Sequence, residues 1–319
     1  MRDQYAGDVS DVLKFAFLRA LAGADRTLGI AWYYAPGDDG RPDGRHLEWR
    51  GEPAWRRLDE KLHTGLKTLP ERSIAALERA AIWPPKGSLF HGEPIPPRGE
   101  RGAWGTRKRS ALDDADIVFL DPDTGIGEET EKHATYSEIQ LLRKPGRAIV
   151  IITFPNRSMK YDAQLQQLHE RLAIETRAEN IITLRTNVSV PGAPGSRSVV
   201  QRPRWFTVVD PDAELAARAK TFFTALKLIP RVSAKLDSVR PALRLDEPHH
   251  DGGRSRPPLV AIVDQQGRPH VGQDFRPRGL RSAARDRDQR LDLLVAYGRR
   301  LGRVLRWFRA LAHLSRPKP

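Results

Sequence analysis

Cysteine is absent from this chain of 319 residues. Its absence excludes disulfide bridges, zinc sites built on thiolates and a thiol nucleophile. Long hydrophobic runs are also absent: AIVIITF, at 148–154, suits a buried strand and falls far short of the ~20 apolar residues that a membrane-spanning helix needs. The sequence does not open with the charged and then apolar segments of a secretory signal. We therefore expect a cytoplasmic protein that is not inserted into a membrane.

Positive charge is abundant and unevenly distributed. The chain carries 54 Lys and Arg against 40 Asp and Glu, a net charge of +14. Beyond residue 228 there are 20 basic and 9 acidic residues, so this segment carries +11 and the first 228 residues only +3. Such an excess attracts polyanions. It indicates a nucleic-acid partner, although a solvated, arginine-rich tail would have the same composition.

Short apolar runs alternate with helical patterns as far as residue 228. The alternation predicts an α/β domain over 1–228, with a mostly parallel sheet and helices on both faces. The Pro- and Arg-rich segment 229–258 predicts a linker, and 259–319 a basic C-terminal extension with a long helix. Runs typical of strands are TLGIAWYYA, DADIVFLD, RAIVIITF, IITLRTN and RWFTVVD, and the clearest amphipathic patterns span 9–21, 161–173 and 213–226.

Asp121 is the acidic residue whose position says most about chemistry. It ends the run IVFLDPDTG, where Pro122 stops the strand because proline cannot donate a ladder hydrogen bond. A carboxylate at the carboxyl end of a buried strand reaches the crevice above the sheet, where α/β proteins bind ligands. The run resembles the catalytic loop of amino-methylating class I methyltransferases, in which an acid holds the exocyclic amine with its lone pair toward the methyl donor. Two other interpretations remain: Asp121 caps a turn, or Asp121 and Asp123 bind Mg²⁺.

The segment YAGDVSDVLK, residues 5–14, resembles a known family signature. RlmJ-like ribosomal RNA adenine-N6 methyltransferases have roughly HAGNxADVLKH, which Ala6, Gly7 and 11–14 match, while Tyr5 replaces His and Asp8 replaces Asn. IVFLDPD occupies the place of the family's acid-Pro-Pro-Tyr loop. IITFPNR and WFTVVDPDAELAARAKTFF resemble later landmarks. The resemblance covers residues 5 to about 226.

This resemblance implies a Rossmann-like class I methyltransferase fold, S-adenosylmethionine as cofactor and an exocyclic amine of nucleic acid as substrate, with RNA favoured over DNA. Asp121 would orient the amine, and no metal is implied. The full set of residues assigned on this basis is Asp121, Asp123 and Tyr5 at the reacting centre, and Lys14, Gly37, Asp38, Gly40 and Gly92 at the cofactor.

The sequence also departs from the family. WYYAPGDDG has aromatic residues where the first strand should end in an acid, and no aromatic residue follows Pro122. Glu78 and Glu93 are the acids considered for the cofactor ribose. Two alternative functions therefore stay open: a methyltransferase-fold module that binds nucleic acid without chemistry, and a metal-dependent nucleic-acid enzyme that uses Asp121 and Asp123.

Overall fold

The computed structural model describes residues 1–37, 46–97, 99–156, 158–191, 198–242 and 261–263. The compact unit to which they belong spans Met1–His270. Most of the expected C-terminal extension, 259–319, lies outside the described residues. Within the described part of the chain, no helix is both long and apolar enough to span a membrane.

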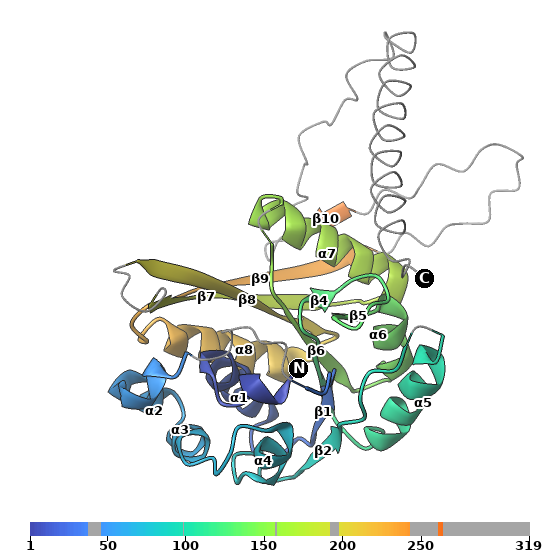
Figure 1. Cartoon of the computed structure of the whole chain (residues 1–319). Helices are drawn as coiled ribbons and strands as arrows, with labels where there is room; N and C mark the ends of the chain where they lie inside the picture. The colour runs from blue at the N-terminus through green and yellow to red at the C-terminus, as the bar shows by residue number, and fades with distance from the viewer. Residues whose placement is uncertain (38–45, 98, 157, 192–197, 243–260, 264–319) are drawn as a thin grey trace, which may run out of the picture. The chain divides into compact units, whose positions relative to one another are not determined.

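An eight-stranded mixed sheet forms the centre of this unit (Figure 1). Its parallel part runs β2-β1-β3-β6, and beyond β6 each neighbouring pair is antiparallel, so β8 and β9 oppose the other strands. In sheet order the strands are β10 (Ala261–Val263), β9 (Val232–Ala242), β7 (Ile181–Pro191), β8 (Val199–Val209), β6 (Ala148–Thr153), β3 (Ile117–Asp121), β1 (Leu28–Trp32) and β2 (Ser88–His91). A separate short pair joins β4 (Gly125–Ile126) to β5 (His133–Ala134).

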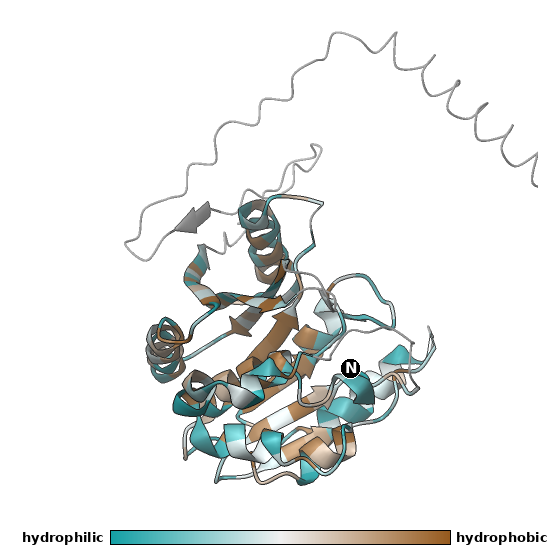
Figure 2. Ribbon diagram, turned by 60° about the vertical axis from the view of Figure 1, so that its left-hand side comes forward, coloured by the Kyte–Doolittle hydropathy of each residue, from teal (hydrophilic) through white to brown (hydrophobic). Residues whose placement is uncertain are grey.

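Helices cover both faces of the sheet, because its central strands are apolar on both sides. Every residue of β1 and β3 is buried, and Figure 2 shows the central strands in brown. One face packs against α1 (Val9–Ala22), α2 (Pro53–Leu58), α3 (Glu60–Lys67), α4 (Ile74–Arg79) and α8 (Ala213–Leu226). The other packs against α5 (Arg101–Ala111), α6 (Tyr136–Leu142) and α7 (Tyr161–Thr176). The α/β class and the two-sided cover are confirmed.

The expected domain boundary at residue 228 needs correction. Val232–Ala242, assigned from the sequence to a linker over 229–258, forms β9 and pairs with β7 from Val188↔Val232 to Ile181↔Val239. Val232, Ala234 and Leu236 pack against the core at every second position. This period of two is that of a half-buried strand, and the Pro and Arg residues around it hide the pattern. Residues 243–258 of the expected linker lie outside the described residues.

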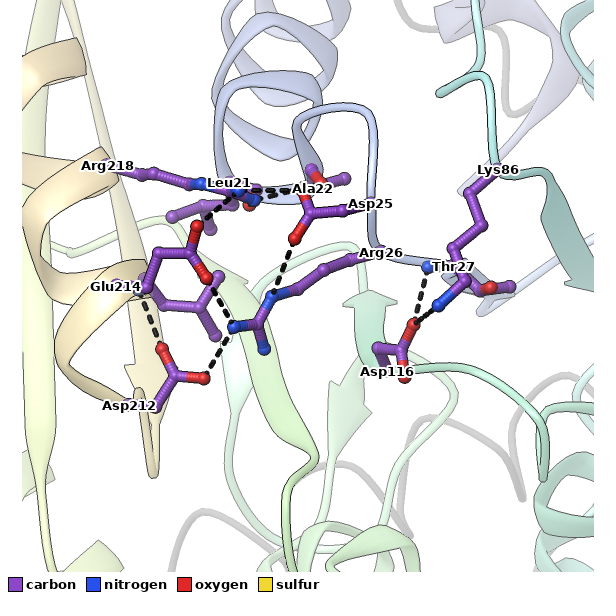
Figure 3. A network of polar contacts seen from close by, with 11 residues as sticks. Leu21, Ala22, Asp25, Arg26, Thr27, Lys86, Asp116, Asp212, Glu214 and Arg218 are labelled. Carbon is purple, nitrogen blue, oxygen red and sulfur yellow. Dashed lines mark hydrogen bonds and ion pairs between the residues drawn. The ribbon is translucent and has the colours of Figure 1, made fainter.

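Ion pairs and hydrogen bonds connect the end of α1 to the start of α8 near the amino ends of the parallel strands (Figure 3). Arg26 Nη2 lies 2.7 Å from Asp212 Oδ2 and 3.0 Å from Glu214 Oε2, at the start of α8. Arg218 donates to the carbonyls of Leu21 and Ala22, at 2.8 and 3.0 Å, and so binds the last turn of α1. These contacts lie at the opposite end of the sheet from the carboxyl ends of the parallel strands.

A buried histidine makes stability depend on pH. His169 of α7 shares a hydrogen bond of 2.8 Å with Thr183 Oγ1, and burial lowers its pKa from 6.5 to about 4. The unfolded chain therefore binds a proton more readily below pH 6.5, and stability should fall as pH drops from 6.5 towards 4. We expect His169→Gln to remove up to about 3 kcal/mol of this dependence. Urea unfolding at several pH values measures it, and equal pH slopes in both proteins would contradict this role.

Candidate functional site at the carboxyl ends of β1 and β3

The strand order reverses at the carboxyl ends of β1 and β3. From β1 the chain crosses to β2 on one side, whereas β3 pairs with β1 on the other side. Trp32 and Asp121 are register partners at the last position of these two strands. Ligands of open α/β sheets bind at such a reversal of strand order. Asp121 therefore lies where the topology favours binding.

The segment YAGDVSDVLK forms the entry to α1, and its polar residues hold that entry in place. Asp8 is the N-cap and accepts hydrogen bonds from the backbone N–H groups of Ser10 (2.7 Å) and Asp11 (3.2 Å). Asp11 in turn accepts a hydrogen bond of 2.6 Å from the backbone N–H of Gly7. Gly7 has φ +75°, which favours glycine. The first turn of α1 is thus ordered by its own carboxylates.

Lys14, one helical turn further on, joins this segment to β3. Its ammonium lies 2.7 Å from Asp11 Oδ1 and 2.9 and 3.1 Å from the two oxygens of Asp121. Lys14 and Asp121 are each 3% exposed and Asp11 is fully buried. Burial opposes the charge of Lys14, but its carboxylate partners raise its pKa above the usual value. Burial raises the pKa of Asp11 to about 6, although Lys14 acts in the opposite direction. We call these three residues the Asp11–Lys14–Asp121 triad.

Residues 1 and 2 lie along the segment that follows β1. The amino group of Met1 donates to the carbonyl of Tyr33 at 2.5 Å and lies 2.7 Å from Asp123 Oδ1. Ala35 N–H donates to the Met1 carbonyl at 3.0 Å, and Arg2 donates to the carbonyl of Gly37 at 3.1 Å. Asp123 therefore faces the same end of β1 as Asp121, and both carboxylates contact cations of the chain.

The structure brings together some of the residues that the sequence singles out. Asp121 and Lys14 are in direct contact, and Asp123 lies two residues beyond. Tyr5 ends the 3-10 helix Asp3–Tyr5 and packs, partly buried, against the core on the α1 side. Gly37 has φ +85°, and a Cβ there would meet nothing within 4 Å. Asp38 and Gly40 lie outside the described residues.

A further carboxylate, Glu78 of α4, lies at the carboxyl ends of β1 and β2. The indole N–H of Trp32 donates to Glu78 Oε1 at 2.8 Å. A Cβ on Gly92, the residue that follows β2, would be 3.4 Å from the same oxygen. Burial raises the pKa of Glu78. From the sequence, Glu78 is only one of two candidates. Its helix, α4, does not directly follow β1 or β2 in the sequence, and only the tertiary fold brings Glu78 to the ends of these strands.

Sequence reasoning missed a second cluster of buried charges, on the opposite face of β1. Glu138 accepts hydrogen bonds from Tyr33 Oη (2.8 Å) and Arg101 Nε (2.7 Å). Lys108 Nζ lies 3.4 Å from Glu138 Oε1 and 4.1 Å from the ring centroid of Trp104. Burial lowers the pKa of Lys108 to about 8. Burial disfavours the charge on Glu138, but Lys108 and Arg101 prevail and lower its pKa to about 2. The cluster holds the side chain of Tyr33, the residue that follows β1, through the hydrogen bond from its hydroxyl to Glu138.

The magnesium interpretation gains no support from this geometry. Asp121 faces Lys14, and Asp123 faces the amino group of Met1. Among the described residues, no three His, Cys, Asp or Glu side chains lie close enough together to hold a metal ion.

Comparisons with known proteins leave the family open. No protein-family model matches the chain, and no curated protein matches it significantly. A crystal structure of protein LPL1258 from Legionella pneumophila, a DUF519 protein, is similar with a TM-score of 0.38 and 14% sequence identity. The similarity covers 73% of this chain and 98% of that chain. So distant a likeness identifies neither a family nor an activity.

Proposed function

We propose that this chain transfers a methyl group from S-adenosylmethionine to an exocyclic amine of nucleic acid, with RNA favoured over DNA. One observation carries the proposal: Asp121 ends β3 at the reversal of strand order, with both of its oxygens hydrogen-bonded to Lys14. A fixed carboxylate at this place suits an N–H donor that must be oriented. The resemblance of residues 5–14 and of IVFLDPD to RlmJ-like enzymes favours the same chemistry.

The residues around Asp121 suit the polar groups of the cofactor. Glu78, at the ends of β1 and β2, can accept hydrogen bonds from ribose hydroxyls, as acids near this edge do in dinucleotide-binding folds. Asp123 can pair with an ammonium, as it does here with Met1. A Cβ at Gly37 would meet nothing within 4 Å, whereas a Cβ at Gly92 would contact Glu78 and Trp32. Lys14 is engaged by two carboxylates, so we assign it to holding Asp121 in place.

In this proposal the bound cofactor supplies an electrophilic methyl group on a sulfonium. Asp121 accepts a hydrogen bond from the amine and thereby directs the nitrogen lone pair at the methyl carbon. Lys14 fixes the rotamer of Asp121 through two hydrogen bonds. The low exposure of the pair strengthens these interactions because water competes little for them. Orientation and electrostatics provide most of the catalysis, and the nitrogen gives up its proton as it attacks.

The basic excess beyond residue 228 supports a nucleic-acid substrate. Lys and Arg contacts with phosphates raise affinity without reading sequence. Because β9 is part of the sheet, a truncation at residue 229 would remove a paired strand.

Glu78 offers a test of the cofactor's placement. We expect Glu78→Gln to raise the dissociation constant of S-adenosylmethionine about 10-fold, because a neutral amide is a weaker acceptor for ribose hydroxyls than a carboxylate. Isothermal titration calorimetry measures the change. Glu60→Gln is the matched control, since Glu60 is an exposed residue of α3 that pairs with Arg56. Equal affinities in the wild type and Glu78→Gln would remove Glu78 from the site.

The function itself is tested by methyl transfer. The full chain is incubated with S-adenosylmethionine carrying a labelled methyl group and with RNA or DNA, and the digested nucleosides are examined by mass spectrometry. We expect a label on an exocyclic nitrogen, with more in RNA than in DNA. A folded protein that labels neither polymer would contradict the proposal.

A second candidate is the nucleic-acid-binding module without chemistry. It is favoured by the low exposure of Asp121, 3%, and by the engagement of both its oxygens by Lys14. This candidate expects binding to nucleic acid that weakens with salt, no affinity for S-adenosylmethionine and no labelled nucleoside.

A further inference from the structure

The triad leads from the end of β3 into the buried interior of α1. Asp121 contacts Lys14 at 2.9 and 3.1 Å, and Lys14 contacts Asp11 at 2.7 Å. The two Lys14–Asp121 contacts are hydrogen bonds, and the Lys14–Asp11 contact is an ion pair at a hydrogen-bond distance. Since Asp11 is fully buried, it lies at the end of this path remote from bulk water.

We propose that Asp11 receives the proton that the substrate amine gives up, with Lys14 transferring it from Asp121. This inference rests on the proposed function, because it names the final acceptor of a proton that this reaction must release. Asp11 belongs to the YAGDVSDVLK segment, in which neither the resemblance nor the residue pattern gave it a role.

The atoms and electrons of the step balance as follows. The amine nitrogen forms a bond to the methyl carbon as the carbon–sulfur bond breaks, and the electron pair of that bond stays on sulfur, which becomes a neutral thioether. As this bond forms, the nitrogen gives one of its protons to Asp121. Lys14 gives one of its protons to Asp11 and takes the one on Asp121. Lys14 and Asp121 end as they began, and Asp11 ends protonated.

The charged groups around Asp11 favour the binding of one proton. The groups that face it are Asp8 and Lys14 from α1, Asp121 from β3 and Arg204 from β8. All are buried. Three carboxylates, with Asp11 included, therefore accompany two cations, an excess of one negative charge. Burial disfavours that excess and favours the neutral form of Asp11, whose pKa is raised to about 6.

Carbon-detected NMR of carboxyl-labelled protein, without any cofactor, tests the proton site separately from the reaction. The Asp11 signal, assigned by comparison with Asp11→Asn, is expected to titrate with a midpoint near 6. Asp121→Asn should lower that midpoint, because it removes a neighbouring negative charge. Titration of Asp11 below about 4, the range of an ordinary aspartate, would overturn the inference.

Single-turnover kinetics tests the role of Asp11 in the reaction. The side-chain amide in Asp11→Asn keeps a single oxygen, which can serve either the Gly7 N–H or Lys14, and it could not accept the proton, so we expect this variant to slow methyl transfer at least about 10-fold. The wild-type rate should rise with pH through about 6, as Asp11 becomes free to accept a proton, and the variant should lack this rise. Asp8→Asn is the comparison variant, since Asp8 caps the same turn through backbone N–H groups; it should keep the rise but at a lower pH, because it removes a negative charge near Asp11.

The possible outcomes separate the two proposals. Equal rates and equal pH profiles for wild type and Asp11→Asn contradict the proton transfer even if the chain is a methyltransferase. If the folded chain transfers no methyl group, the proposed function is wrong. The NMR titration then decides the proton site alone: a midpoint near 6 that falls in Asp121→Asn supports it, and a midpoint below about 4 rejects it.

Discussion

Methyl transfer by Asp121→Ala is expected to be at least about 100-fold slower than by the wild type, the size of effect seen when one oriented group is removed from a reacting centre. The affinity for S-adenosylmethionine should change little, because Asp121 contacts the amine and not the cofactor in the proposed mechanism. Removal of Asp121 leaves Lys14 paired with Asp11, so the buried site still holds a cation beside a carboxylate. Single-turnover rates and calorimetric affinities measure the two effects.

Two further variants sharpen this test. Asp121→Asn keeps one carbonyl oxygen for the amine and should retain more activity than Asp121→Ala. Asp162→Asn is the matched control, because Asp162 is an exposed residue of α7 that pairs with Arg185, and it should transfer at the wild-type rate. Wild-type rates in Asp121→Ala would remove Asp121 from the mechanism.

Glu138→Ala is expected to lower the free energy of unfolding by about 3–5 kcal/mol, the largest effect on stability that we expect. Glu138 is the carboxylate that offsets the buried charges of Arg101 and Lys108, at 2.7 and 3.4 Å. Its removal leaves two cations in the interior without a negative partner. The substitution also ends the capping box of α6 that Glu138 forms with Thr135. Urea unfolding measures the loss.

Lys108→Met provides the comparison for Glu138→Ala. Lys108 is fully buried between Trp104 and Tyr33, and without it Glu138 and Arg101 form a balanced pair. An apolar side chain of similar length should therefore be tolerated at a cost of less than about 1 kcal/mol, or should even stabilise. A loss below about 1 kcal/mol in Glu138→Ala would show that the cluster does not depend on its carboxylate.

The sequence predicts much of the sheet because the strands that form its centre are continuous apolar runs. Ile117–Asp121 and Ala148–Thr153 lie within the expected runs, and Pro122 follows the end of β3 as expected. The sequence predicts a linker at Val232–Ala242 because the segment 230–258 is rich in Pro, Arg, Asp and His. The burial of β9 depends on pairing with β7, which is distant in sequence. The local order of apolar and polar residues does not reveal that partner.

Within the site, residue types could be predicted but their contacts could not. Lys14 and Asp121 were each singled out, yet they are 107 positions apart and their pairing depends on the packing of α1 against β3. Lys108 lies in the basic run RGAWGTRKRSA of α5, which has the composition of an exposed helix. Lys108 is buried because its ammonium lies against the rings of Tyr33 and Trp104 and pairs with Glu138. Contacts of this kind are determined by the tertiary fold and leave no local pattern.

Calorimetric titration of the full chain with S-adenosylmethionine, and then with S-adenosylhomocysteine, is the most direct measurement of the central claim that the ends of β1 and β3 form a methyl donor site. We expect saturable binding of both compounds at one site per chain. Circular dichroism of the same sample establishes that the protein is folded. Absence of binding heat for both compounds at several temperatures, from a folded protein, would contradict the claim and favour the module that binds nucleic acid alone.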